Sequence, residues 1–156
     1  MADTSSTQPG GHSRSHACPS NGAVSHAIAP RTVKALLTMD ALGRLSNRPH
    51  FFCSDPACDT VYFDDAGVCF VRRDVRVPVY QKEPPGGRLL CYCFGESEEG
   101  ILLEVATTGR SEAAARVRRH IAAGRCACDL RNPKGTCCLG EVVRAVKAAE
   151  NLSSSS

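Results

Sequence analysis

The chain has 156 residues, of which ten are cysteines, 22% are charged and only 5% are aromatic, and its formal net charge is +3. This length suits one domain, or two very small ones that need help from something other than a hydrophobic core. Tryptophan is absent, so large rings cannot supply the dense packing of a compact fold without cross-links. No block of lysine and arginine is interleaved with aromatic residues, which argues against nucleic acid as a partner.

The N-terminal residues indicate the compartment. Residues 1–16 are polar and contain no apolar run, which predicts neither a secretory signal nor a membrane span. A reducing cytoplasm is therefore expected, and in that compartment paired cysteines favour metal ligation over disulfides. Residues 1–16 and 151–156 are rich in small and polar residues and are predicted to be disordered tails.

The first half of the chain combines one short helix with several strands. Residues 32–42 carry apolar side chains at spacings that suit one face of a helix. Four β-branched or aromatic runs then predict strands, at residues 51–53, 60–63, 68–71 and 75–79. The turn residues 64–67 separate two of these runs and predict a hairpin. We expect a small subdomain over residues 17–83 with a β-hairpin at its centre.

The second half is predicted to be helical. Residues 82–87 are rich in proline and glycine, lack periodicity and mark the boundary. Helical patterns follow at residues 97–107, 111–123 and 140–150. Ser111 is expected to cap the second helix and Gly124 to end it. Residues 88–150 are therefore predicted to form a helical subdomain, which makes the whole chain α+β.

Six cysteines lie in this helical half as three close pairs: Cys91 and Cys93, Cys126 and Cys128, Cys137 and Cys138. Soft thiolates at such short spacings suit zinc or an iron–sulfur cluster. Cys93 and Cys138 each precede a predicted helix, whose first N–H groups would stabilise the negative charge of a cluster. Spacing alone leaves open which member of each of the last two pairs is a ligand.

Three segments together carry a resemblance to a known family: residues 52–63 around Cys53 and Cys58, residues 90–95 around the Cys-Tyr-Cys step, and residues 128–138. In this order they resemble the N-terminal metal-binding domain of CopZ-type copper chaperones, over about residues 18–150. The resemblance implies zinc in the first half and, in a helical half similar to bacterioferritin-associated ferredoxin, a 2Fe-2S cluster. The cluster ligands it implies are Cys91, Cys93, Cys128 and Cys138.

The same resemblance implies a zinc knuckle in the first half. The run Cys18-Pro19-Ser20-Asn21-Gly22 resembles the family's Cys-Pro-x-Cys-Gly, but its second cysteine is replaced by Asn21. The implied zinc ligands are Cys18, Cys53 and Cys58, and a neutral amide is a poor fourth ligand. His16 and His26 are close enough in sequence to complete the site. The alternative is that the three cysteines only pack in a core, as we expect for Cys69.

In function, the resemblance implies a role in copper handling or one-electron transfer, with a copper-carrier domain or a metal-transport ATPase as partner. No Cys-x-x-Cys occurs in the sequence, so copper transfer by the family's usual route is not expected. A zinc-only protein-interaction module is the main alternative. A thiol enzyme ranks last, because no Cys/His arrangement, Ser/His/Asp triad or Gly-rich phosphate loop points to catalysis. The sequence leaves the oligomeric state open.

Overall fold

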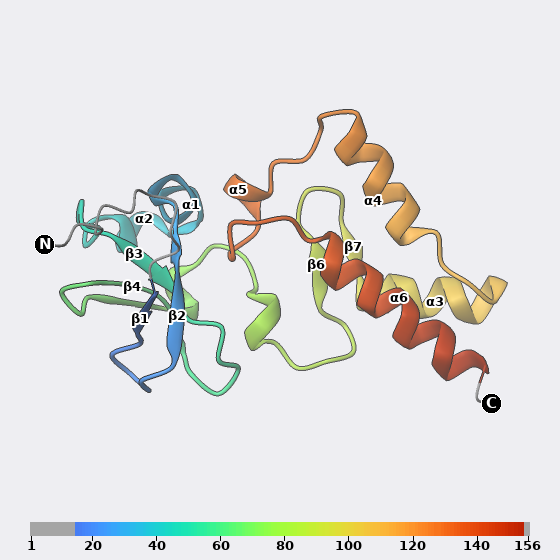
Figure 1. The fold of residues 1–156 in the computed structure, drawn as a ribbon, viewed down its shortest axis with the longest axis horizontal. Coiled ribbons are helices and arrows are strands. Elements are labelled where there is room, and N and C mark those ends of the chain that lie inside the picture. The colour runs from blue at the N-terminus through green and yellow to red at the C-terminus, as the bar shows by residue number, and fades with distance from the viewer. Residues whose placement is uncertain (1–14, 155–156) are drawn as a thin grey trace, which may run out of the picture.

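A computed structural model describes residues 15–154, which form a sheet half and a helical half lying side by side (Figure 1). The sheet half contains β1 (Ser15–Ala17), β2 (Val24–Ile28), α1 (Pro30–Leu36), α2 (Met39–Leu42), β3 (His50–Phe52), β4 (Thr60–Asp64) and β5 (Cys69–Val71). The helical half contains β6 (Leu89–Cys91), β7 (Glu96–Ser97), α3 (Glu98–Thr108), α4 (Ala113–Ala122), α5 (Cys128–Arg131) and α6 (Leu139–Ser154). This arrangement confirms the predicted α+β class.

The first half is built on an antiparallel sheet with the strand order β1-β2-β3-β4-β5. The strands predicted at residues 51–53, 60–63 and 68–71 are confirmed as β3, β4 and β5. The strand predicted at 75–79 is wrong: Pro78 has no N–H to donate, and only Val75 forms an isolated bridge, with Leu37. β1 and β2 were not predicted, because their short, polar segments lack a strand signal. The expected hairpin is therefore part of a larger sheet.

The helix predicted at residues 32–42 is two helices. Pro30 occupies the first turn of α1, where its missing N–H costs nothing. The backbone is extended at Leu37, which ends this helix, and the Thr38 hydroxyl then accepts a hydrogen bond from the N–H of Ala41 at 3.2 Å. A Thr side chain in that position caps a new helix, so local chemistry restarts the helix as α2.

Two of the helices predicted in the second half agree closely with α3 and α6. Ser97 caps α3 by accepting from the N–H of Gly100 at 3.0 Å. α4 begins at Ala113, and Glu112 at its cap position makes no side-chain cap; the Ser111 hydroxyl, one residue earlier, accepts from the N–H of Ala113 at 3.1 Å. Both predicted tails, at residues 1–16 and 151–156, extend too far into the chain, because β1 begins at Ser15 and α6 continues to Ser154. Residues 1–14 and 155–156 lie outside the described residues.

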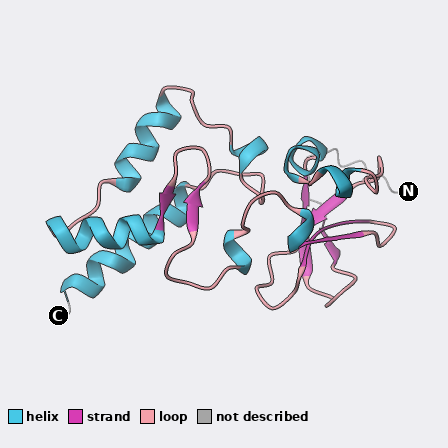
Figure 2. Cartoon of the chain, turned by 180° about the vertical axis from the view of Figure 1, so that it is seen from behind, coloured by secondary structure: helices cyan, strands magenta, loops and turns pink. Residues whose placement is uncertain are grey.

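Each half has its own hydrophobic core, and in both views α5 lies at the junction between them (Figures 1 and 2). The Thr32 hydroxyl donates to the carbonyl of Asp129 at 2.6 Å, and the Tyr62 hydroxyl donates to the carbonyl of Pro133 at 2.6 Å. A Cβ at Gly135 would lie 3.2 Å from Thr32 Oγ1, so this position needs glycine. The sheet half thus anchors the loop between α5 and α6.

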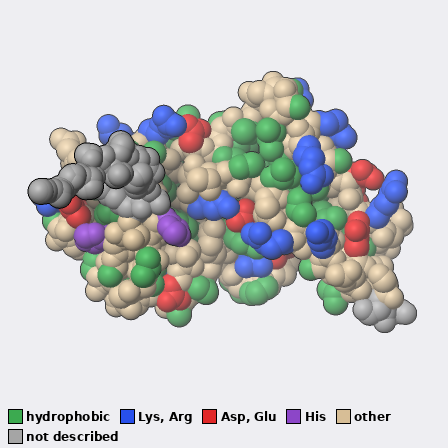
Figure 3. Space-filling view, in the orientation of Figure 1, with side chains coloured by type: hydrophobic (Ala, Val, Ile, Leu, Met, Phe, Trp, Pro, Cys, Tyr) green, Lys and Arg blue, Asp and Glu red, His purple; other side chains and the backbone are tan. Residues whose placement is uncertain are grey.

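The described residues contain no helix that combines the length and the apolar character needed to cross a membrane. On the face shown in Figure 3, lysine and arginine side chains extend from the middle over the helical half, with aspartate and glutamate among them.

Candidate metal centres

Three cysteines converge at one end of the sheet. The sulfurs of Cys18, Cys53 and Cys58 all lie within 4.8 Å of one another, and all three residues are buried. Cys18 follows β1, whereas Cys53 and Cys58 bracket the loop between β3 and β4. Their sulfurs are close enough to bind one ion at zinc–sulfur distances of about 2.3 Å. The structure therefore brings together the three cysteines that the sequence predicts as zinc ligands.

Backbone N–H groups surround these sulfurs. Burial opposes ionisation of Cys18, but hydrogen bonds from the N–H groups of Ser20 and Asn21 and from neighbouring thiols outweigh it, so the pKa of Cys18 is lowered. At Cys53 burial dominates and raises the pKa to about 11, against a hydrogen bond from the Asp55 N–H and the charge of Lys82. A bound cation would reverse this desolvation penalty, because it favours the thiolate.

Lys82 contacts the loop between Cys53 and Cys58, and no sequence motif pointed to it. Its side chain is only 4% exposed, and its ammonium donates to the carbonyls of Asp55 at 2.7 Å and Cys58 at 2.8 Å. A lysine is rarely buried without compensation for its charge. No spacing rule identifies such a residue, because the loop it supports lies more than twenty positions earlier in the chain.

The histidines proposed as a fourth ligand do not reach this site. Among the described residues no histidine or carboxylate joins the three sulfurs at that spacing. The His16 ring stacks on Phe51, with ring centroids 4.9 Å apart, and His26 lies in β2 opposite Phe52. The expectation that His16 or His26 completes the zinc site is therefore not met in this structure.

The second group of cysteines lies in the core of the helical half. Its members are the four predicted cluster ligands: Cys91, Cys128 and Cys138 are buried, and the half-buried Cys93 packs against them. The sulfurs of Cys93 and Cys128 are 4.0 Å apart, and the N–H of Ala127 donates to Cys93 at 3.1 Å. The other members of the last two pairs, Cys126 and Cys137, are exposed. Burial thus separates the predicted ligands from the spare cysteines, a distinction that spacing could not make.

Cys138 is hydrogen-bonded to two other thiols of this group. A hydrogen bond from Cys138, opposed by burial, lowers the pKa of Cys128 to about 6. The same partner lowers the pKa of Cys91 to about 7, again against burial. Cys138 is the donor in both bonds, first to Cys128 and then to Cys91, so its own pKa is raised. Two of the four sulfurs therefore favour the thiolate form near neutral pH, the form that binds metal.

Side-chain contacts hold the surrounding loops in place. The Arg116 guanidinium donates to both carboxylate oxygens of Glu96, at 2.7 and 3.0 Å, and to both of Glu104, at 3.0 Å each. Glu96 lies three residues after Cys93, so this ion-pair network fixes the turn that follows the cysteine. On the same turn, the Phe94 ring stacks on His120 of α4, with centroids 3.9 Å apart.

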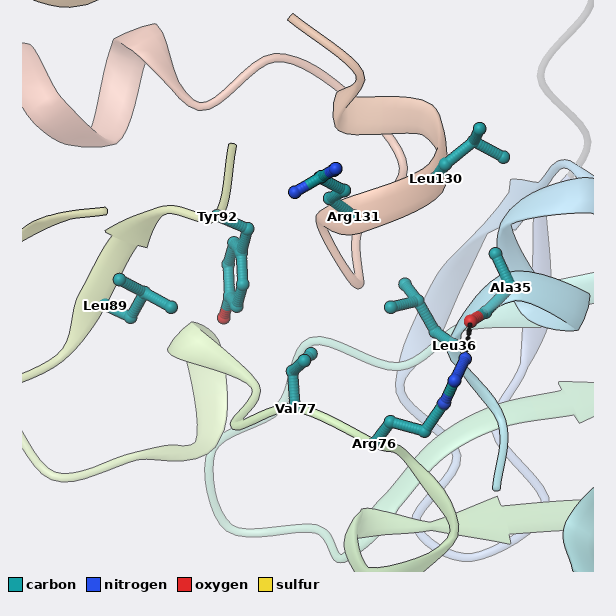
Figure 4. Close-up of a pocket in the computed structure, with 8 residues that line it drawn as sticks. All are labelled: Ala35, Leu36, Arg76, Val77, Leu89, Tyr92, Leu130 and Arg131. Carbon is teal, nitrogen blue, oxygen red and sulfur yellow. Dashed lines mark hydrogen bonds between the residues drawn. The ribbon is translucent and has the colours of Figure 1, made fainter. Parts of the chain in front are cut away.

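A cleft of about 390 Å³ lies between the two halves, next to Tyr92 of the Cys-Tyr-Cys step (Figure 4). Its lining residues are Ala35, Leu36, Arg76, Val77, Leu89, Tyr92, Leu130 and Arg131. Tyr92 stands between Cys91 and Cys93 in the sequence, and its hydroxyl donates to the carbonyl of Pro78 at 2.6 Å. Two arginines therefore face a space that adjoins the backbone of the Cys-Tyr-Cys step.

Comparisons with known proteins agree with the fold and with a zinc site in the sheet half. Residues 15–76 match the CopZ family model described as a zinc binding domain. The copper chaperone CopZ of Archaeoglobus fulgidus is 30% identical over 122 residues, which cover 78% of this chain and 57% of that protein. The X-ray structure of the Archaeoglobus fulgidus CopZ N-terminal domain matches with a TM-score of 0.67 at 25% identity, covering 83% of this chain and 96% of that one.

Fold, cysteine site and family match together define a small metal-binding protein with a zinc-binding sheet half. The chain is, more particularly, a CopZ-type N-terminal domain. It spans a little over half of the curated relative and nearly all of the solved N-terminal domain. The resemblance seen in the sequence is thereby confirmed.

Proposed function

We propose that this domain holds a 2Fe-2S cluster through Cys91, Cys93, Cys128 and Cys138, beside the zinc site of the sheet half. The observation that supports it is the gathering of these four cysteines in one core, where Cys91, Cys128 and Cys138 are buried and Cys93 is half-buried, while Cys126 and Cys137 are exposed. Four thiolates are the ligand set of such a cluster, and the cluster would supply one-electron redox chemistry.

The spacing of the four sulfurs favours a cluster over a second zinc. Within the described part of the chain, only Cys18, Cys53 and Cys58 form a group of three sulfurs close enough for a single ion. In the helical half, the contacts instead form a chain through four sulfurs, from Cys93 to Cys128, from Cys128 to Cys138 and from Cys138 to Cys91. Such an extended set of four thiolates suits a 2Fe-2S core, whose two irons share four thiolates between them.

The biological role we propose is one-electron transfer in copper handling. A curated relative is named a copper chaperone, and no Cys-x-x-Cys copper loop occurs in these 156 residues. Copper would then be bound by a partner, either a copper-carrier domain or a metal-transport ATPase. The chain's own residues would hold the cluster, keep water from the buried sulfurs and present the Tyr92 cleft to that partner. A cytoplasmic location would suit this role, because its thiolates need a reducing environment.

The test is to purify the chain without oxygen, record its visible spectrum and count its metals. The proposal predicts brown protein with about two irons and two sulfides per chain, and about one zinc ion. The alternative function, a zinc-only interaction module, predicts colourless protein with no iron. Colourless protein that stays so after attempted cluster reconstitution would contradict the cluster and favour that alternative.

A further inference from the structure

We propose that the metal held by Cys18, Cys53 and Cys58 keeps its fourth coordination position open to an external neutral donor, filled by water in the isolated protein. The inference rests on the proposed metal binding at this site. It adds that three protein thiolates are the complete ligand set, which differs from the closed, four-ligand form of a structural zinc site.

Asn21 provides the first observation, because it stands where the knuckle pattern has its second cysteine. Its side-chain Nδ2 donates to Asp55 Oδ2 at 2.7 Å, and its Oδ1 accepts from the N–H of Ala23 at 3.0 Å. Both ends of the amide are therefore engaged. Asp55 lies in the loop between the other two ligands, and its N–H is hydrogen-bonded to Cys53. A direct hydrogen bond thus joins the two cysteine loops where a fourth thiolate would join them through the metal.

A second cross-link supports the same geometry. The hydroxyls of Ser20 and Thr60 are hydrogen-bonded to each other at 2.7 Å, again between the first loop and the segment after Cys58. The two loops are held together without a fourth protein ligand. No histidine or carboxylate in the described range of residues 15–154 takes its place.

Charge is the third observation. A divalent ion with three thiolates carries a net charge of −1, and the buried Lys82 ammonium, hydrogen-bonded beneath Cys58, supplies +1. The set is then neutral, so a neutral fourth donor adds no buried charge. A fourth thiolate would add an uncompensated negative charge, which is costly to bury. Water and imidazole fit this condition.

The site is also reachable from solvent. Residues 19–22 and residues 56 and 57, which flank the three ligands, are exposed. A small donor could therefore approach between the two cysteine loops without opening the core of the sheet half. This is the property that separates an exchangeable coordination position from a closed structural one.

Zinc K-edge X-ray absorption on the cluster-loaded chain tests the proposal, because it reports on zinc alone. The expected result is about three sulfurs at about 2.3 Å and one oxygen or nitrogen at about 2.0 Å per zinc. Added imidazole should bring in the multiple scattering of an imidazole ring without loss of zinc.

Asn21→Cys should give four sulfurs, no response to imidazole and zinc release to a chelator at least about tenfold slower. Asn21→Ser, which also removes the Asn21 amide but supplies no thiolate, is the matched control and should keep three sulfurs and the response to imidazole.

Four results would overturn the proposal. Four sulfurs in the unchanged chain would mean that another cysteine completes the site. An imidazole signature present before imidazole is added, and lost in His12→Ala, would make His12 the fourth ligand. A chain that contains cluster iron but takes up no zinc would overturn the metal site itself, whereas bound zinc with an unresponsive spectrum would overturn only the open position.

Discussion

The hydrogen bond between Tyr62 and Pro133 is the contact that best tests how the sheet half supports the cluster loop. Tyr62 is fully buried, and its hydroxyl donates to the Pro133 carbonyl at 2.6 Å. Burial raises the pKa of this hydroxyl, so it stays protonated as a donor. Tyr62→Phe removes the donor, keeps the ring and so creates no large cavity. Leaving a buried carbonyl without its partner costs about 1–3 kcal/mol, and we expect a loss of about 2 kcal/mol in the free energy of unfolding.

The measurement is urea unfolding of the metal-loaded protein without oxygen, with equal metal content in each sample because bound metal contributes to stability. Tyr80→Phe is the control. The Tyr80 ring lies under the Arg88 guanidinium, 4.1 Å from centroid to carbon, and the described residues include no hydrogen-bond partner for its hydroxyl. The midpoint should fall for Tyr62→Phe with an unchanged m-value, and should hardly move for the control.

The same substitution should loosen the cluster, because Pro133 lies between Cys128 and Cys138 in the sequence. If about 1 kcal/mol of the loss falls on this loop, iron release to a chelator should be about fivefold faster. Equal midpoints for the two variants, or unchanged iron release in Tyr62→Phe, would refute the view that the sheet half positions the cluster loop.

Three further predictions concern charge and exposure. Lys82→Met should weaken zinc binding about tenfold or more, because the ammonium balances the thiolates; zinc competition with a chelator measures this, with exposed Lys147→Met as control, and equal affinities would contradict it. Hydrogen bonds from Arg116 lower the pKa of Glu104 to about 2, so the stabilisation is present above pH 4.5 and is lost as the pH falls towards 2. Arg116→Met should therefore cost about 1–2 kcal/mol at pH 7 after allowance for screening, with the difference shrinking below pH 4.5 and vanishing only below about pH 2; a constant difference in acid unfolding curves would be inconsistent with this. In the cluster-loaded protein, iodoacetamide should label exposed Cys126 and Cys137 before the four proposed cluster ligands, as peptide mass spectrometry can check; early labelling of Cys128 or Cys138 would reverse the ligand assignment.

Local sequence signals predicted those elements whose stability is local. The β-branched and aromatic runs predicted β3, β4 and β5, and the helical pattern over residues 97–107 predicted α3. These local signals did not predict strands whose pairing partners are distant in the sequence or whose own residues are polar. β1 is three exposed residues, Ser15–Ala17, that become a strand only by pairing with β2.

The candidate site divides in the same way. The order of the cysteine motifs and the family resemblance predicted which cysteines lie together at each centre. What they could not predict is the supporting chemistry. The Asn21–Asp55 hydrogen bond and the buried Lys82 depend on loops 24 to 34 positions apart, and no local spacing encodes them.

The measurement that tests the central claim most directly is the electron paramagnetic resonance spectrum of the dithionite-reduced protein in two neighbouring substitutions. A reduced 2Fe-2S cluster is paramagnetic, whereas zinc gives no signal. We predict that Cys137→Ser keeps both the signal and about two irons per chain, while Cys138→Ser loses both and keeps its zinc. A signal that survives in Cys138→Ser and disappears in Cys137→Ser, or no signal in the unchanged chain, would contradict the assignment of the buried cysteines as cluster ligands.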